Sequence, residues 1–286
     1  MNVISRSWSI TKLTFSVIGK DKEMLLFPLL GTIASLLYVV ALLVPSGVLE
    51  MITGGGLVDG TVGFIHYAIL FMIYLGLAFI ASFFNVCVVY TTKIRFEGGD
   101  ATFGQSIAFA MGKIGMIFQW SVIAATVGVL LAMLENLAEK LGGIGEIILK
   151  IVRSLLGMMW SVITLFVIPV LVYEDISPAA AVHRSTEILK KTWGESIARS
   201  LGLGLMQFIA IFCTIGLTML LLFAMPASSI TPIIAGIGAI AFVGVILTFN
   251  VANMVFNTAL YVYASTGSEP EMFEAGTLAN AFKQTA

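Results

Sequence analysis

Six long apolar stretches constrain this chain more than any other feature. They run approximately over residues 24–44, 63–91, 114–134, 154–173, 200–224 and 232–263, and the central part of each lacks Asp, Glu, Lys and Arg. A helix of about 20 apolar residues crosses the hydrocarbon core of a bilayer. The sequence therefore predicts an all-α polytopic membrane protein, a single transmembrane domain with six spanning helices and a tail over residues 264–286.

The composition supports this class of protein. Hydrophobic residues make up 59% of the chain and charged residues 11%, whereas soluble domains carry about 25% charged residues. A formal net charge of -1 gives no basic excess that would favour nucleic acid as a partner. Both cysteines, Cys87 and Cys213, fall inside apolar stretches, where they act as small hydrophobic side chains.

The distribution of basic residues predicts the topology. Twelve of the 15 Lys and Arg residues lie in the N-terminal segment, the second-to-third and fourth-to-fifth connections and the C-terminal tail. Basic residues accumulate on the cytoplasmic side, so we expect both termini in the cytoplasm and the protein in the cell membrane.

One outer connection, over residues 135–153, allows two interpretations. Its apolar residues recur at helical spacing on either side of Gly142 and Gly143. One interpretation is a helical hairpin that extends the third and fourth spans beyond the bilayer, with Glu146, Lys150 and Arg153 on its wet face. The other is a helix that lies on the outer membrane surface.

The stretch from Glu174 to Ser200 predicts an amphipathic helix, for which Ser177 suits the N-cap and Pro178 the first helical position. Seven residues share an apolar arc: Ala181, Val182, Ser185, Ile188, Leu189, Thr192 and Trp193. We expect the helix to lie along the membrane surface with this arc in the acyl boundary. Its candidates for contact with lipid headgroups are Arg184, Lys190, Lys191 and Trp193.

Parts of the sequence resemble one another. The spacing of Arg6, Ile10, Lys12 and Phe15 recurs in Arg184, Ile188, Lys190 and Trp193. A third apolar helical face follows Asp100, a candidate N-cap, and a fourth helix is expected at 276–284. These likenesses suggest a cytoplasmic helix plus a membrane hairpin, repeated three times.

The polar residues inside the spans are mostly amides. Asn250, Asn253 and Asn257 recur on one face of the sixth span, with Tyr261 one turn further. Asn85, Gln119 and Gln207 are expected at a similar depth. Together they indicate either a polar pathway open to the cytoplasm or hydrogen bonds between packed helices.

Other chemistry has little support in the sequence. His66 and Asp59 make a weak metal signal, and no metal site is predicted. No histidine or lysine lies in the centre of a span, which argues against buried haem and a retinal Schiff base, so no cofactor is expected. No nucleophile and base are paired in the sequence, and we expect no enzyme activity.

Two stretches carry a family resemblance. RSWSITKLTFSVIGKDKEMLLFPLL at the start, together with IPVLVYEDISPAAAVHRSTEILKKTWG, resembles a family of uncharacterised prokaryotic six-helix membrane proteins. The second stretch is also similar to the membrane domain of some glycerophosphodiester phosphodiesterases. The resemblance implies a fold and a membrane location and no activity.

Two functions follow from these patterns. The first is a non-enzymatic protein that interacts with membrane lipids, with other membrane proteins or with further copies of itself, in an accessory or scaffold role. The second is a channel or transporter for a neutral or lipid-like solute through the amide-lined face.

Overall fold

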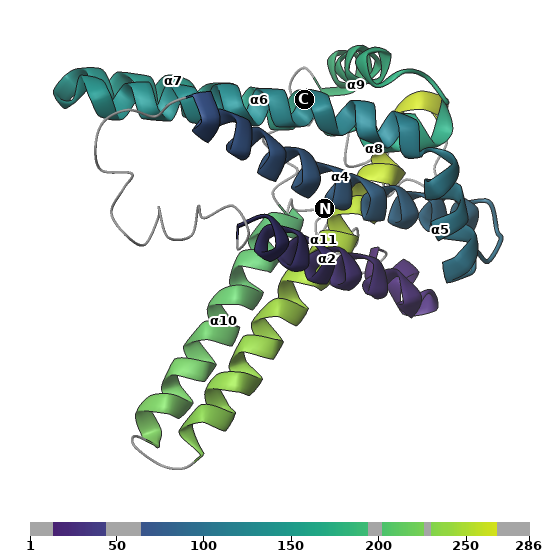
Figure 1. The fold of residues 1–286 in the computed structure, drawn as a ribbon. Coiled ribbons are helices and arrows are strands. Elements are labelled where there is room, and N and C mark those ends of the chain that lie inside the picture. The colour runs from purple at the N-terminus through teal and green to yellow at the C-terminus, as the bar shows by residue number, and fades with distance from the viewer. Residues whose placement is uncertain (1–13, 44–63, 194–201, 226–229, 268–286) are drawn as a thin grey trace, which may run out of the picture. The chain divides into compact units, whose positions relative to one another are not determined.

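The computed structural model describes residues 14–43, 64–193, 202–225 and 230–267 (Figure 1). These ranges are helical and contain no strand. Within these described ranges, six helical segments are long and apolar enough to cross a membrane: Lys22–Leu43, Tyr67–Phe96, Ile114–Leu141, Gly143–Tyr173, Met206–Ala224 and Thr231–Thr266. The predicted all-α fold with six spanning helices is confirmed.

The described helices follow one another in this order along the chain. Their bounds are η1 Lys22–Leu25, α2 Leu26–Leu43, α4 Phe64–Phe96, α5 Phe103–Gly112, α6 Ile114–Leu141, α7 Gly143–Ile163, α8 Val167–Tyr173, α9 Pro178–Trp193, α10 Gly202–Ala224 and α11 Thr231–Thr266. At about 1.5 Å per residue, α4 and α11 are each longer than a hydrocarbon core of about 30 Å. Both must tilt or extend beyond the bilayer, as their length in the sequence predicts.

The chain divides into two compact units, which are described separately. The first unit comprises Met1–Pro28, Val88–Phe103 and Ile188–Ala286. The second comprises Leu29–Cys87 and Gly104–Glu187.

In the first unit, α10 and α11 form a hairpin of two helices that lie side by side (Figure 1). Gly238 permits this close approach, because a Cβ atom at that position would lie 2.4 Å from Cγ2 of Thr218. The N-terminal part of the unit also reaches α11: η1 contacts this helix, and the ring of Phe15 meets the ring of Phe249 edge-on at 5.6 Å.

In the second unit, α6 and α7 form a long antiparallel hairpin that turns at Gly142 and Gly143. Both glycines have positive φ, a region that suits glycine. Arg153 on α7 pairs with Glu135 on α6 at 2.8 Å, and Lys150 pairs with Glu146 one turn away at 2.7 Å. Residues 135–153 therefore form a helical hairpin and not a separate helix, while the extension of this hairpin beyond the bilayer stays a prediction.

The same unit packs α2 against α4 through Tyr38. The hydroxyl of Tyr38 donates a hydrogen bond to the backbone carbonyl of Met72 at 2.6 Å. Gly76 lies one turn further along α4, where a Cβ atom would be 2.1 Å from the Tyr38 ring. The glycine thus lets the aromatic side chain lie flat on the neighbouring helix, which is the use of small residues expected between membrane helices.

The internal repeat stays a prediction. Most of its first copy, from Arg6, and its last helix at 276–284 lie outside the described residues.

Candidate functional site

The fourth span is interrupted by a break at residues 164–166. α7 ends at Ile163 and α8 begins at Val167. Pro169 gives the physical reason: it has no N–H to donate to the carbonyl of Leu165, and in a continuous helix its ring would clash with that carbonyl. A broken helix inside a membrane protein frees backbone groups that must find other partners.

Ser185 of α9 bridges this break. Its hydroxyl donates to the carbonyl of Ile163 at 2.6 Å and accepts from the N–H of Phe166 at 3.1 Å. Ser185 is fully buried. One hydroxyl therefore satisfies the last backbone carbonyl of α7 and the N–H of the last residue in the break, and we call this arrangement the Ser185 bridge.

Ion pairs fix the turn that leads into α9. Arg184 Nε donates to both carboxylate oxygens of Glu174, at 3.0 and 3.1 Å. Asp175, a residue with a φ of 49°, pairs with Lys113 at the start of α6. The predicted start of the helix is confirmed: α9 begins at Pro178, and Ser177 Oγ accepts from the N–H of Ala180 at 3.4 Å.

Four of the seven residues in the predicted apolar arc of α9 are covered by protein, while Val182 is half-buried and the side chains of Thr192 and Trp193 lie outside the described residues. Ala181 and Ser185 are fully buried, and Ile188 and Leu189 are also buried. This corrects the expectation that the arc lies in the acyl boundary of the membrane. The physical reason at Ser185 is that the broken span offers backbone hydrogen-bonding groups, which lipid tails do not provide.

The opposite face of α9 is charged and exposed. The His183 side chain is 79% exposed and lies 3.4 Å from a carboxylate oxygen of Glu187. Of the predicted headgroup contacts, Lys190 is exposed, while Arg184 is 40% exposed and pairs with Glu174 and Glu187. The side chains of Lys191 and Trp193 lie outside the described residues.

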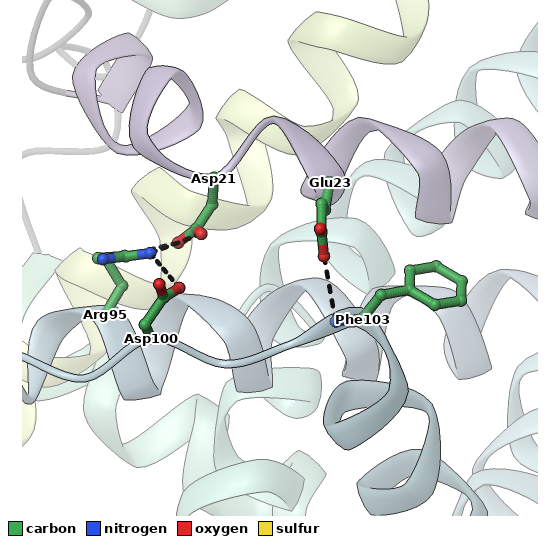
Figure 2. A network of polar contacts seen from close by, with 5 residues as sticks. All are labelled: Asp21, Glu23, Arg95, Asp100 and Phe103. Carbon is green, nitrogen blue, oxygen red and sulfur yellow. Dashed lines mark hydrogen bonds and ion pairs between the residues drawn. The ribbon is translucent and has the colours of Figure 1, made fainter.

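The first unit holds a separate polar cluster, which we call the Arg95 cluster. Figure 2 shows the guanidinium of Arg95 facing the carboxylate of Asp21. Arg95 Nε donates to Oδ2 at 2.6 Å and Nη2 to Oδ1 at 2.5 Å. The Asp21 side chain is only 9% exposed, and that of Arg95 17%. This bidentate geometry is the strongest form of carboxylate pairing.

The cluster also reaches the start of α5. Arg95 Nη2 donates to Asp100 at 2.6 Å, and Glu23 accepts a hydrogen bond from the backbone N–H of Phe103 at 3.2 Å (Figure 2). Glu23 therefore satisfies a free N–H in the first turn of α5. Asp100 was expected as the N-cap of this helix, and it pairs with Arg95 instead, three residues before α5 begins.

The amides of α11 lie along one edge of that helix. Asn250 is exposed, Asn253 and Asn257 are half-buried, and Tyr261 is buried. Across the part of the chain that the structure describes, no hydrogen bond joins the three asparagine side chains to another group. Their role stays a prediction.

The other predicted polar residues are dispersed. Asn85 on α4 and Gln207 on α10 are half-buried, and Gln119 on α6 is exposed. The side chain of His66 and the whole of Asp59 lie outside the described residues. Among the described residues, no group of three or more His, Cys, Asp and Glu side chains could hold a metal ion.

Sequence reasoning missed the residues that position α9. Helical periodicity predicts on which face of α9 Ser185 lies, and it does not predict which groups the Ser185 hydroxyl contacts. A signal was present: Pro169 in the middle of an apolar stretch predicts freed backbone groups. Arg184 was assigned to lipid, although Glu174 stands ten residues before it.

Comparison with known proteins adds a family. No curated protein matches the chain, and the comparisons give no support to the expected similarity to the membrane domain of glycerophosphodiester phosphodiesterases. A family model described as a family of unknown function, DUF6159, matches residues 64–270, which is more than two thirds of the chain. The match covers α4 to α11 and so includes both the Ser185 bridge and the amides of α11. The chain belongs to the family of unknown function DUF6159.

Proposed function

We propose that this is a non-enzymatic integral membrane protein that acts by interaction with membrane lipids or other membrane proteins, in an accessory or scaffold role. The observation that supports the proposal is the docking of α9. The Ser185 bridge and the pair between Arg184 and Glu174 hold the helix against the fourth span. Its opposite face, with His183, Glu187 and Lys190, is left exposed.

The docking determines the kind of interaction that we propose. Because Ala181 and Ser185 are buried, this part of the apolar arc of α9 is not available to insert among acyl chains. Lys190 and Lys191 would instead attract anionic headgroups, each contributing about 1 kcal/mol near a membrane surface. By the distribution of basic residues we place this face in the cytoplasm. The interaction is then electrostatic and sensitive to salt.

Energy transfer to labelled lipids tests the proposal. A donor dye is attached to His183→Cys in the full chain without Cys87 and Cys213, reconstituted with headgroup-labelled phosphatidylglycerol or phosphatidylcholine. We expect more transfer to phosphatidylglycerol, and the excess should vanish at 1 M salt, where the screening length is about 3 Å. Lys190→Gln/Lys191→Gln should remove the excess, while Lys140→Gln, at the predicted outer end, should keep it. Equal transfer to the two lipids at low salt would count against the lipid role.

A second function, transport of a neutral or lipid-like solute, is favoured by one observation. Asn250 is exposed on a predominantly apolar span, and among the described residues the side chains of Asn250, Asn253 and Asn257 make no hydrogen bond. Amides in a membrane need water or a partner. Single cysteines at these three positions, treated with a membrane-impermeant thiol reagent, distinguish the cases. Labelling at all three would favour a wet pathway, and protection at Asn250 and Asn253 would favour a helix interface.

A further inference from the structure

The second unit contains an apolar groove that no function above uses. It runs between α6 and α7 and has a volume of about 560 Å³. Its walls are apolar side chains, from Val127 to Leu137 on α6 and from Leu156 to Ile163 on α7. Several of them are open to the surroundings of the helices, among them Leu130 at 54% and Met159 at 57% exposure. The volume lies within the range of about 300–1,000 Å³ that is usual for ligand pockets.

The groove has the length of one leaflet. Positions 127 to 137 on α6 span about 15 Å at a rise of about 1.5 Å per residue. The hydrocarbon core of a bilayer is about 30 Å thick, so one acyl chain crosses half of it. An acyl chain that enters at the Leu137 end would therefore reach Val127 near the bilayer centre.

Charged groups stand at the Leu137 end of the groove. Arg153 precedes Leu156 by one helical turn, and its Nε donates to Glu135 at 2.8 Å. A guanidinium has five N–H donors, and among the described residues this is the only polar contact of Arg153. The side chain is 45% exposed. It has donors left for a phosphate beside the Leu137 end of the groove.

We propose that this groove is a binding site for one phospholipid of the surrounding bilayer. One acyl chain lies between α6 and α7, and the phosphate accepts hydrogen bonds from the free Nη groups of Arg153. Met133 and Met159 in the walls are flexible enough to follow a flexible tail. The inference goes beyond the proposed role of α9 and is independent of it, so either can fail alone.

Quenching of Trp160 by a brominated lipid tests the site, because this tryptophan lines the groove. Trp8, Trp120 and Trp193 are replaced by Phe in the full chain, which leaves Trp160 as the only tryptophan. The protein is reconstituted in vesicles of a galactolipid, which has no phosphate, with a small fraction of brominated phosphatidylglycerol, whose headgroup is anionic. We expect the quenching of Trp160 to correspond to about fivefold enrichment of the brominated lipid at the groove over its fraction in the bulk bilayer. This is the enrichment that one basic residue gives for an anionic headgroup.

Two pairs of variants separate the parts of the site. Arg153→Gln should abolish the enrichment, and Lys140→Gln, a nearby exposed lysine, should keep it. Leu134→Phe/Leu156→Phe narrows the groove and should lower quenching, whereas Ile144→Phe/Ile148→Phe, on exposed positions of α7 outside the groove, should not. Quenching that follows the bulk fraction in every variant would overturn the proposal. Absence of quenching in the parent would also overturn it and would indicate that protein covers the groove.

Discussion

The Arg95 cluster and the ion pairs of α9 use the same chemistry but differ in how far their side chains are buried. In both, a basic side chain holds an acidic residue close to the end of a membrane helix. The pair of Asp21 and Arg95 has side-chain exposures of 9% and 17%, whereas Glu174 and Arg184 have 25% and 40%, and Asp175 has 72%. Burial determines what the loss of one partner costs. Water screens the charges of an exposed pair, whereas a buried charge whose partner is removed has neither water nor a counter-charge beside it.

The difference teaches which contacts hold the fold and which present a surface. The Arg95 cluster ties together segments that are 74 residues apart in the sequence, and it is mostly covered. In the second unit the buried contact of α9 is a hydroxyl, and the ion pairs lie at its edge. We infer that the Arg95 cluster is structural and that the charged face of α9 is free for interaction.

The largest expected effect is the loss of Arg95. Arg95→Gln leaves the Asp21 carboxylate buried without its partner, and breaking a buried pair costs about 3–5 kcal/mol. We expect a value near the lower end, measured as the free energy of unfolding in detergent micelles. Asp21→Asn/Arg95→Gln should recover part of the loss. The control is Arg153→Gln, which breaks an exposed pair with Glu135 and should cost at most about 1 kcal/mol. An equal loss of stability in the Arg95 and Arg153 variants would contradict the distinction between buried and exposed pairs.

Loss of the Ser185 bridge should come second. Ser185→Ala removes the hydrogen bond to the carbonyl of Ile163 and the one from the N–H of Phe166, at an expected cost of about 1–3 kcal/mol for the two together. Hydrogen exchange at the Phe166 amide should also become faster. The matched control is Thr186→Val, because the Thr186 hydroxyl bonds the carbonyl of Val182 within α9. If the two variants lose the same stability, the bridge does not hold α9.

Removing the ion pair of α9 should have a smaller effect. Arg184→Gln breaks a partly exposed pair, worth about 0.5 kcal/mol at low salt. The difference in free energy of unfolding between this variant and the unchanged protein should disappear at 1 M salt, where the screening length is about 3 Å. A loss that persists at high salt would show that Arg184 is as structural as Arg95.

The smallest effect on stability is expected at Lys190. Lys190→Gln removes an exposed charge, and exposed substitutions usually change the free energy of unfolding by less than about 0.5 kcal/mol. The same variant should still reduce energy transfer from α9 to labelled phosphatidylglycerol. A change in stability without a change in lipid contact would reverse the assignment of this face.

Hydropathy and length were enough to predict the six spans, because crossing a bilayer demands a long apolar helix whatever its neighbours are. The start of α9 also followed from local residues, since Ser177 and Pro178 act on their own helix. The partners of Ser185 and Arg95 could not be predicted in this way. They depend on which segments meet in space, and neither periodicity nor charge distribution contains that information.

The prediction for the apolar arc of α9 failed for a related reason. An amphipathic pattern indicates that one face avoids water, and it does not distinguish lipid from protein as the cover. The break caused by Pro169 made protein the better cover, because it offered Ser185 two hydrogen bonds. The same ambiguity applies to the amides of α11, because the sequence does not distinguish water from a second helix as their hydrogen-bonding partner.

The most direct test of this account is the reactivity of single cysteines on α9, in the membrane, in a chain without Cys87 and Cys213. Ala181→Cys is on the docked arc, and His183→Cys is on the exposed face. The account predicts that Ala181→Cys reacts slowly with both a lipid-soluble and a water-soluble maleimide, while His183→Cys reacts rapidly with the water-soluble reagent. Rapid reaction of Ala181→Cys with the lipid-soluble reagent alone would mean that the arc lies among acyl chains and would contradict the account.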